Sequence, residues 1–132
     1  MKQNIYIALV DDWELRGNGA GDVREMQVAP MRRLMDAYER HGVHGTFNVE
    51  VMQQLKMLEA SREHPELGAQ TAAWEEAVLE ARRRGHDIQL HIHPQWHNAK
   101  YLDGKWQLDQ NWDITTYPEE EVREMFTAEE KI

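Results

Sequence analysis

The side chains in this sequence best suited to chemistry are a histidine cluster and a pair of aspartates. His91, His93 and His97 fall within the stretch HIHPQWH, and Asp11-Asp12 follow an apolar run. Imidazole nitrogens and carboxylate oxygens together suit zinc, and also manganese, iron, cobalt or nickel. Two histidines and one aspartate would leave coordination positions open for water and substrate, as catalytic metal sites do.

Short strands must position these side chains. Residues 5–10 form a continuous apolar run rich in β-branched residues, which predicts a strand buried on both faces and ended by Asp11-Asp12. Residues 46–49 predict a second strand, and residues 87–93 a third. Alternate residues of a strand share a face, so His91 and His93 are expected on the polar face of the third strand.

Helices are expected between the strands, and a hairpin after them. Apolar residues recur at helical spacing over residues 31–38, 52–58 and 74–81, and Asp103-Gly104 between two apolar pairs predicts a hairpin. A last helix is expected from Pro118. This order predicts a parallel sheet, in which the carboxyl ends of the strands meet at one rim. The aspartate pair and the histidines would then share that rim.

Each of these features also has a structural interpretation. Asp11-Asp12 would serve equally well as a turn that caps backbone amides at a strand end. His91 and His93 would also fit the solvated side of an edge strand, and His97 follows Pro94, as a surface loop residue does.

Two further features are ambiguous at the level of sequence. Trp96, Trp106 and Trp112 fit either a sugar-stacking surface or, as we favour, the core of a small subdomain around the hairpin. Glu50 shares a face with Asn48 of the second strand and is expected to approach the rim.

Composition limits the class of protein. The chain has 132 residues, 41% hydrophobic and 30% charged, which fits a single domain over residues 1–132. A formal net charge of −9 argues against nucleic acid and anionic membrane as partners. The absence of cysteine excludes thiol chemistry, and no apolar stretch reaches the length of a membrane span, so a cytoplasmic protein is expected.

Three stretches together resemble the polysaccharide deacetylase family, carbohydrate esterases that remove N-acetyl groups from amino sugars. ALVDDWE at residues 8–14 is similar to the family's first motif, and HGVHGTFNV at residues 41–49 to its following helix-to-strand segment. RRGHDIQLHIHPQW at residues 83–96 resembles its second, histidine-bearing motif. The resemblance covers about residues 4–97 and implies metal-dependent deacetylation of an N-acetylated saccharide, with zinc the first candidate metal.

The resemblance also implies roles for individual residues. Asp11 falls on the general base, Asp12 on a metal ligand and His91 on the first histidine ligand. The second histidine ligand of the family would fall on Gln95, so another histidine must replace it. We favour His93, which projects to the same side as His91, with His97 as the alternative.

The family's later motifs, including the one that carries the general acid, are missing from this chain. We therefore expect an α/β fold, a partial (β/α) barrel of polysaccharide-deacetylase type with about three parallel core strands, a β-hairpin and a C-terminal helix. Such a chain would be the N-terminal portion of a longer barrel or a reduced relative. The alternative function is a non-catalytic metal- or carbohydrate-binding module. An open barrel edge would favour self-association or contact with the remainder of a longer chain.

Overall fold

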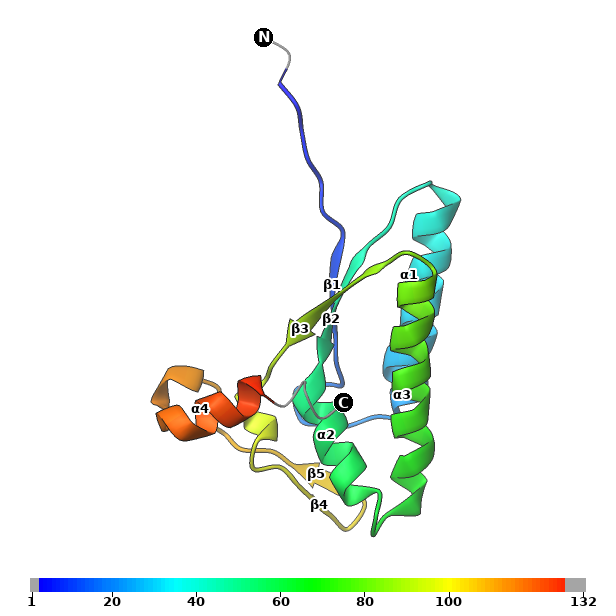
Figure 1. Ribbon diagram of the computed structural model, residues 1–132. Coiled ribbons are helices and arrows are strands. Elements are labelled where there is room, and N and C mark those ends of the chain that lie inside the picture. The colour runs from blue at the N-terminus through cyan, green and yellow to red at the C-terminus, as the bar shows by residue number, and fades with distance from the viewer. Residues whose placement is uncertain (1–2, 128–132) are drawn as a thin grey trace.

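A sheet of three parallel strands forms the centre of the structure (Figure 1). The computed structural model describes residues 3–127. Strands β1 (Val10–Trp13), β2 (Thr46–Glu50) and β3 (Asp87–His91) lie side by side in that order. Because the strands are parallel, helices must connect them, and the carboxyl ends of all three strands lie at the same edge of the sheet.

Two long helices cover one face of the sheet. Helices α1 (Ala29–Arg40) and α3 (Pro65–Arg83) run alongside each other in Figure 1 and pack on the apolar face of the strands. A short π-helical segment, η1 (Arg24–Val28), leads into α1. The apolar face meets the helices through aromatic and aliphatic contacts, among them the rings of Trp13 and Trp74, whose centroids are 5.5 Å apart. This layer is the main hydrophobic core.

The opposite face of the sheet carries polar side chains. Asp12, Asn48 and Gln89 lie in register across β1, β2 and β3. The amide of Asn48 donates a hydrogen bond of 2.9 Å to Asp12 Oδ1. In the described part of the chain the three strands do not close into a barrel, and this polar face is the one that an enclosed barrel would turn inward.

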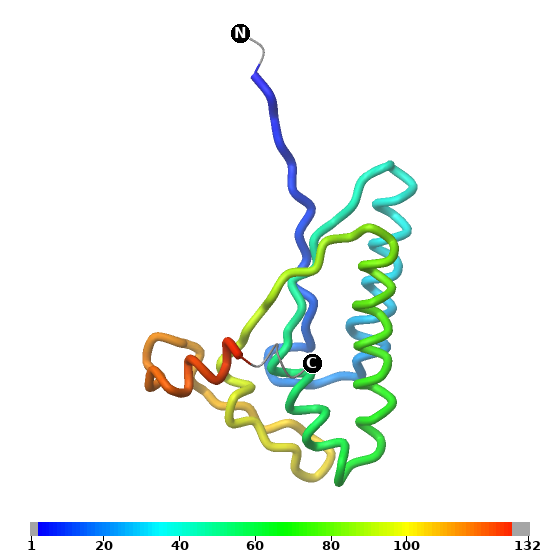
Figure 2. The backbone as a smooth tube through the Cα atoms, viewed as in Figure 1, coloured from blue at the N-terminus to red at the C-terminus, as the bar shows by residue number. Residues whose placement is uncertain are grey.

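The remaining elements form a second, smaller layer beyond the carboxyl ends of the strands. Helix α2 (Val51–Ala60) follows β2 directly, and the chain after β3 turns away from α1 and α3 (Figure 2). Met52, Trp96 and Met125 make a separate small core there. The elements of this part are η2 (Pro94–Trp96), β4 (Lys100–Leu102), β5 (Lys105–Gln107), η3 (Ile114–Thr116) and α4 (Glu119–Phe126).

The expected order of elements is confirmed, including the parallel sheet, the hairpin at Asp103-Gly104 and the C-terminal helix. At the hairpin, Asp103 and Gly104 both adopt positive φ, 51° and 75°, as a tight two-residue turn requires. Among the described residues, no helix has the length and apolar character needed to cross a membrane.

The expected first strand over residues 5–10 is wrong. Strand β1 begins only at Val10, so Asp11 and Asp12 lie inside the strand instead of ending it. The preceding segment extends away from the body of the molecule (Figure 1), and Ile5, Tyr6 and Ile7 are 86%, 89% and 81% exposed. The physical reason is the register: β2 begins at Thr46, opposite Val10, and offers residues 5–9 no strand to pair with.

Candidate metal centre

Four side chains converge where the parallel strands end. Glu50, the last residue of β2, pairs in register with His91, the last residue of β3. Glu14 follows Trp13, which is the partner of Val49, so the strand alternation brings Glu14 to the same level and the same face. His93 lies two residues beyond His91 and points to the same side. Four ligand groups from three strands therefore meet at one rim of the sheet.

The side-chain atoms of this cluster are close enough to share one ion. His91 Nε2 lies 2.9 Å from His93 Nε2 and 3.1 Å from Glu14 Oε2, and that same oxygen also contacts His93 Nε2. One ligand atom from each of Glu14, Glu50, His91 and His93 lies within 4.8 Å of every other.

These separations fit a transition-metal ion. Metal–ligand bonds of about 2.1 Å at right angles place neighbouring ligand atoms about 3 Å apart, and a tetrahedral arrangement places them about 3.4 Å apart. Two of the three separations, 2.9 and 3.1 Å, match the first spacing, and the contact between Glu14 Oε2 and His93 Nε2 is closer than either spacing. Two imidazoles and one carboxylate on one face of an ion are a known donor set for divalent transition metals, and they leave the opposite positions open.

Glu14 and His93 shift each other's pKa toward the charged forms. Burial raises the pKa of Glu14, but its hydrogen bond with His93 and the charges of both imidazoles outweigh burial, so its pKa is lowered overall. The pKa of His93 is raised, chiefly by the same hydrogen bond with Glu14. Each group therefore favours the charged form of the other, and a metal ion would compete with a proton for His93.

Glu50 links the start of helix α2 to the backbone of His93 through hydrogen bonds. Its side chain is fully buried, and its Oε1 accepts hydrogen bonds from the backbone N–H groups of Met52 at 2.8 Å and Gln53 at 3.3 Å. Its Oε2 accepts a bond of 2.6 Å from the backbone N–H of His93. Burial raises the pKa of Glu50 to about 7, despite these bonds. Because both oxygens already accept backbone bonds, Glu50 fits a brace between α2 and His93 better than a metal ligand.

Two buried glutamines fix the backbone on either side of Glu14. Gln53 Oε1 accepts from the backbone N–H of Leu15 at 2.9 Å, and Gln27 donates to the carbonyl of Trp13 at 3.1 Å. The two amides are joined by a 2.8 Å bond from Gln53 to Gln27. Both glutamines are at most 1% exposed, so this network is shielded from water. It fixes the backbone of Trp13 and Leu15, the residues on either side of Glu14.

The two aspartates expected at the site lie on opposite faces of β1. Asp12 shares the polar face with the cluster, and its negative charge contributes to the raised pKa of His93. Its Oδ1 is engaged by Asn48. Asp11 alternates to the helix-covered face, where burial, followed by the charge of Asp12, raises its pKa. The carboxylate that meets the two histidines is Glu14, so the metal-ligand role of Asp12 and the base role of Asp11 stay predictions.

His97 faces a different partner from the other two histidines. Its Nε2 lies 3.4 Å from Glu121 Oε2 of α4, and its ring stands edge-on to Tyr117. The structure thus groups His93, and not His97, with His91. Gln95 is buried, and its amide donates to the Gly17 carbonyl at 3.2 Å.

The three tryptophans near the hairpin have different environments. Trp96 is 3% exposed and belongs to the small core, as favoured from the sequence, and Trp106 packs against it. Trp112 is 56% exposed, and its ring centroid lies 5.9 Å from that of His93. The core position expected for Trp112 is therefore wrong, and this residue offers an open aromatic surface beside the cluster.

Sequence reasoning missed Glu14, although a signal for it was present. In DDWE, Asp12 and Glu14 are two residues apart and must share a face if the strand continues through both. Placing the strand end at Asp11-Asp12 hid that relation.

Comparisons of the chain with protein-family models, with curated proteins and with solved structures gave no match. The geometry of the cluster and the motifs of residues 8–14, 41–49 and 83–96 are therefore the observations that bear on function.

Proposed function

We propose that the chain binds a divalent transition-metal ion through Glu14, His91 and His93, as the metal-binding part of a hydrolase resembling the polysaccharide deacetylases. The observation that carries the proposal is the convergence of one carboxylate oxygen and two imidazole nitrogens: His91 Nε2 lies 2.9 Å from His93 Nε2 and 3.1 Å from Glu14 Oε2, and the same oxygen contacts His93 Nε2. Zinc is the first candidate, and cobalt, nickel, manganese and iron accept the same donors.

The proposed reaction is hydrolysis of the acetamide of an N-acetylated amino sugar. A metal ion in this position would polarise the acetamide carbonyl and favour deprotonation of water. The chain itself supplies the orientation of the ligands, through the glutamine network beside Glu14 and through Glu50 beneath His93. In place of the roles that the resemblance implies for Asp11 and Asp12, we assign the proton-accepting role to Asp12 Oδ2, because Asp12 is exposed on the same face and only its Oδ1 is held by Asn48.

The same proposal includes the fold: the sheet would be part of a (β/α) barrel. A three-stranded parallel sheet with helices on one face and polar residues on the other fits the first part of a (β/α) barrel. In this proposal the remaining strands come from a longer chain or from a second copy, and the protein acts in the cytoplasm.

The alternative is a non-catalytic metal- or carbohydrate-binding module. It is favoured by one observation: within residues 3–127 we identify no acid placed to protonate the departing amine. Trp112, exposed beside His93, would serve sugar binding in either case.

Calorimetric titration of chelator-treated protein with zinc, cobalt and nickel tests the metal site. Glu14→Gln keeps the shape of the side chain and removes its charge, and we expect it to weaken binding by at least about 100-fold, more than loss of an outer partner does. Asp12→Asn is the matched control, two residues before Glu14 and on the same face, and should change affinity less than about threefold. If the two variants behave alike, Glu14 is not a ligand. If the parent protein binds no metal, the proposal fails.

Release of amine from N-acetylglucosamine oligomers then separates the two functions. Metal-dependent release that Asp12→Asn abolishes supports the hydrolase. Tight metal binding without any release supports the binding module.

A further inference from the structure

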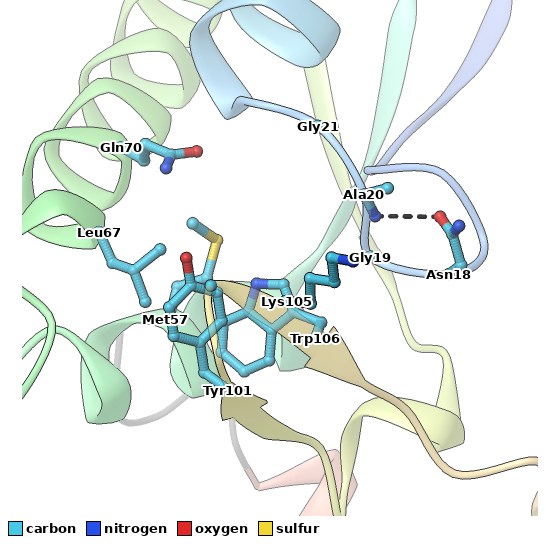
Figure 3. A pocket seen from close by; sticks show the side chains of 11 residues that line it. Asn18, Gly19, Ala20, Gly21, Met57, Leu67, Gln70, Tyr101, Lys105 and Trp106 are labelled. Carbon is cyan, nitrogen blue, oxygen red and sulfur yellow. Dashed lines mark hydrogen bonds between the residues drawn. The ribbon is translucent and has the colours of Figure 1, made fainter.

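A second site lies between the loop after β1, helix α3 and the hairpin. It is a pocket of about 290 Å³, close to the smallest volumes that take small organic ligands (Figure 3). Met57 and Leu67, 1% and 2% exposed, form its apolar base. Tyr101 and Trp106 form an aromatic wall, with ring centroids 5.0 Å apart and planes tilted by 53°. None of the four metal-cluster residues lines this pocket.

Glycine lets the backbone reach this aromatic wall. Gly19 adopts a φ of 71°, and a Cβ at this position would lie 2.8 Å from Trp106 Cβ. On the opposite side, the Asp103-Gly104 turn sets Tyr101 directly across from Trp106. Two turns that require glycine, at Gly19 and at Gly104, therefore position the backbone around Trp106.

The polar groups around the pocket are mainly hydrogen-bond donors. Gln70 Oε1 already accepts a 2.9 Å bond from the backbone N–H of Val23, so the amide NH₂ is the group that Gln70 can offer. The indole N–H of Trp106 and the ammonium of Lys105 can only donate. In Figure 3, Gln70 of α3 and the neighbouring residues Lys105 and Trp106 of β5 border the pocket. A complementary ligand must therefore bring acceptor oxygens.

We propose that this pocket binds a small carboxylate whose body is a ring. The ring would lie against Tyr101 and Trp106 above the apolar base, and the carboxylate would accept hydrogen bonds from Gln70, Trp106 and Lys105. Burial, followed by the negative charge of Glu66, raises the pKa of Tyr101, so the negative end of the ligand belongs on the side of Lys105. The metal site plays no part in this proposal, and the two fail independently.

Two pairs of probes test the proposal and distinguish the kind of ring. Benzoate is compared with benzamide, and glucuronate with glucose, while the indole N–H signal of Trp106 is followed by NMR in ¹⁵N-labelled protein. The Trp106 signal is identified by its loss in Trp106→Phe. Ligands of this size are expected to bind with a Kd of about 1 to 10 mM. We expect at least one carboxylate to shift the Trp106 signal, and its neutral partner to bind at least about fivefold more weakly.

Two lysine variants locate the carboxylate. Lys105→Met keeps the aliphatic stem and removes the charge, and should weaken carboxylate binding about fivefold to tenfold. Lys100→Met is the matched control, because Lys100 is exposed on the neighbouring strand of the same hairpin but does not line this pocket. Equal binding of charged and neutral probes, equal effects of the two lysine variants, or no shift of Trp106 with any probe would each overturn the proposal.

Discussion

Replacing Glu50 with glutamine is expected to change how the stability of the metal-free protein depends on pH. The Glu50 side chain is fully buried, and burial raises its pKa to about 7 from the ordinary 4.5. Glutamine has the shape of the protonated acid and cannot ionise. Both oxygens of Glu50 accept backbone N–H bonds, and the amide NH₂ of glutamine cannot accept one. The variant should therefore be less stable than the parent near pH 4.5, by about 1 to 3 kcal/mol, and should recover relative to the parent as the pH rises.

The magnitude follows from linkage. Between pH 4.5 and about 7 the unfolded chain has released the Glu50 proton while the folded chain retains it. The unfolded state then binds fewer protons, so the free energy of unfolding falls as the pH rises, by about 1.4 kcal/mol per pH unit. Over this window the parent protein loses roughly 3 kcal/mol through Glu50 alone. Glu50→Gln removes that loss.

The assay is urea unfolding of chelator-treated protein at pH 5, 6, 7 and 8, followed by tryptophan fluorescence. His93 also loses stabilisation as the pH rises through its raised pKa, so the informative quantity is the difference between Glu50→Gln and the parent at each pH. Glu63→Gln, which changes an exposed acid, is the control and should run parallel to the parent. A Glu50→Gln variant that is less stable than the parent by the same amount at every pH would show that Glu50 is ionised in the folded state, and would refute the reasoning.

Three further outcomes are expected. Zinc affinity should fall about tenfold per pH unit once the pH drops below the raised pKa of His93, which lies above 6.5, and constant affinity from pH 8 to pH 6 in calorimetry would argue against this ligand. His97→Ala should leave zinc affinity within about twofold, since that ring faces α4, and a large loss would make it a ligand after all. Gly19→Ala should lower the free energy of unfolding in urea by roughly 2 kcal/mol through positive φ and the clash with Trp106. Gly104→Ala, with a similar φ but open space around it, should cost about half as much, and equal losses would contradict the clash.

The periodicity of the sequence was sufficient to predict the order of elements, because helical and strand patterns follow one another clearly. It failed at the first strand, where the apolar run over residues 5–7 is local information and the partner strand is not. Strand limits depend on which residues a neighbour offers for pairing, and a single sequence does not contain that register.

In the candidate site, too, the residues fixed by local patterns were predictable, and those fixed by distant contacts were not. His91 and His93 were predictable because strand alternation is a local property. Glu14 depended on where β1 ends, and Glu50 on the turn from β2 into α2, which lets one buried carboxylate accept bonds from two elements. Nothing in the residue types alone indicates that Gln27 and Gln53 meet behind the site, since they are 26 positions apart.

The extended segment before β1 has a calorimetric consequence. Ile5, Tyr6 and Ile7 are almost as accessible to water in the folded chain as in an unfolded one. They therefore contribute almost nothing to the heat-capacity increment of unfolding or to its sensitivity to urea, both of which scale with newly exposed surface. Both quantities should correspond to a shorter polypeptide than the 132 residues of the chain.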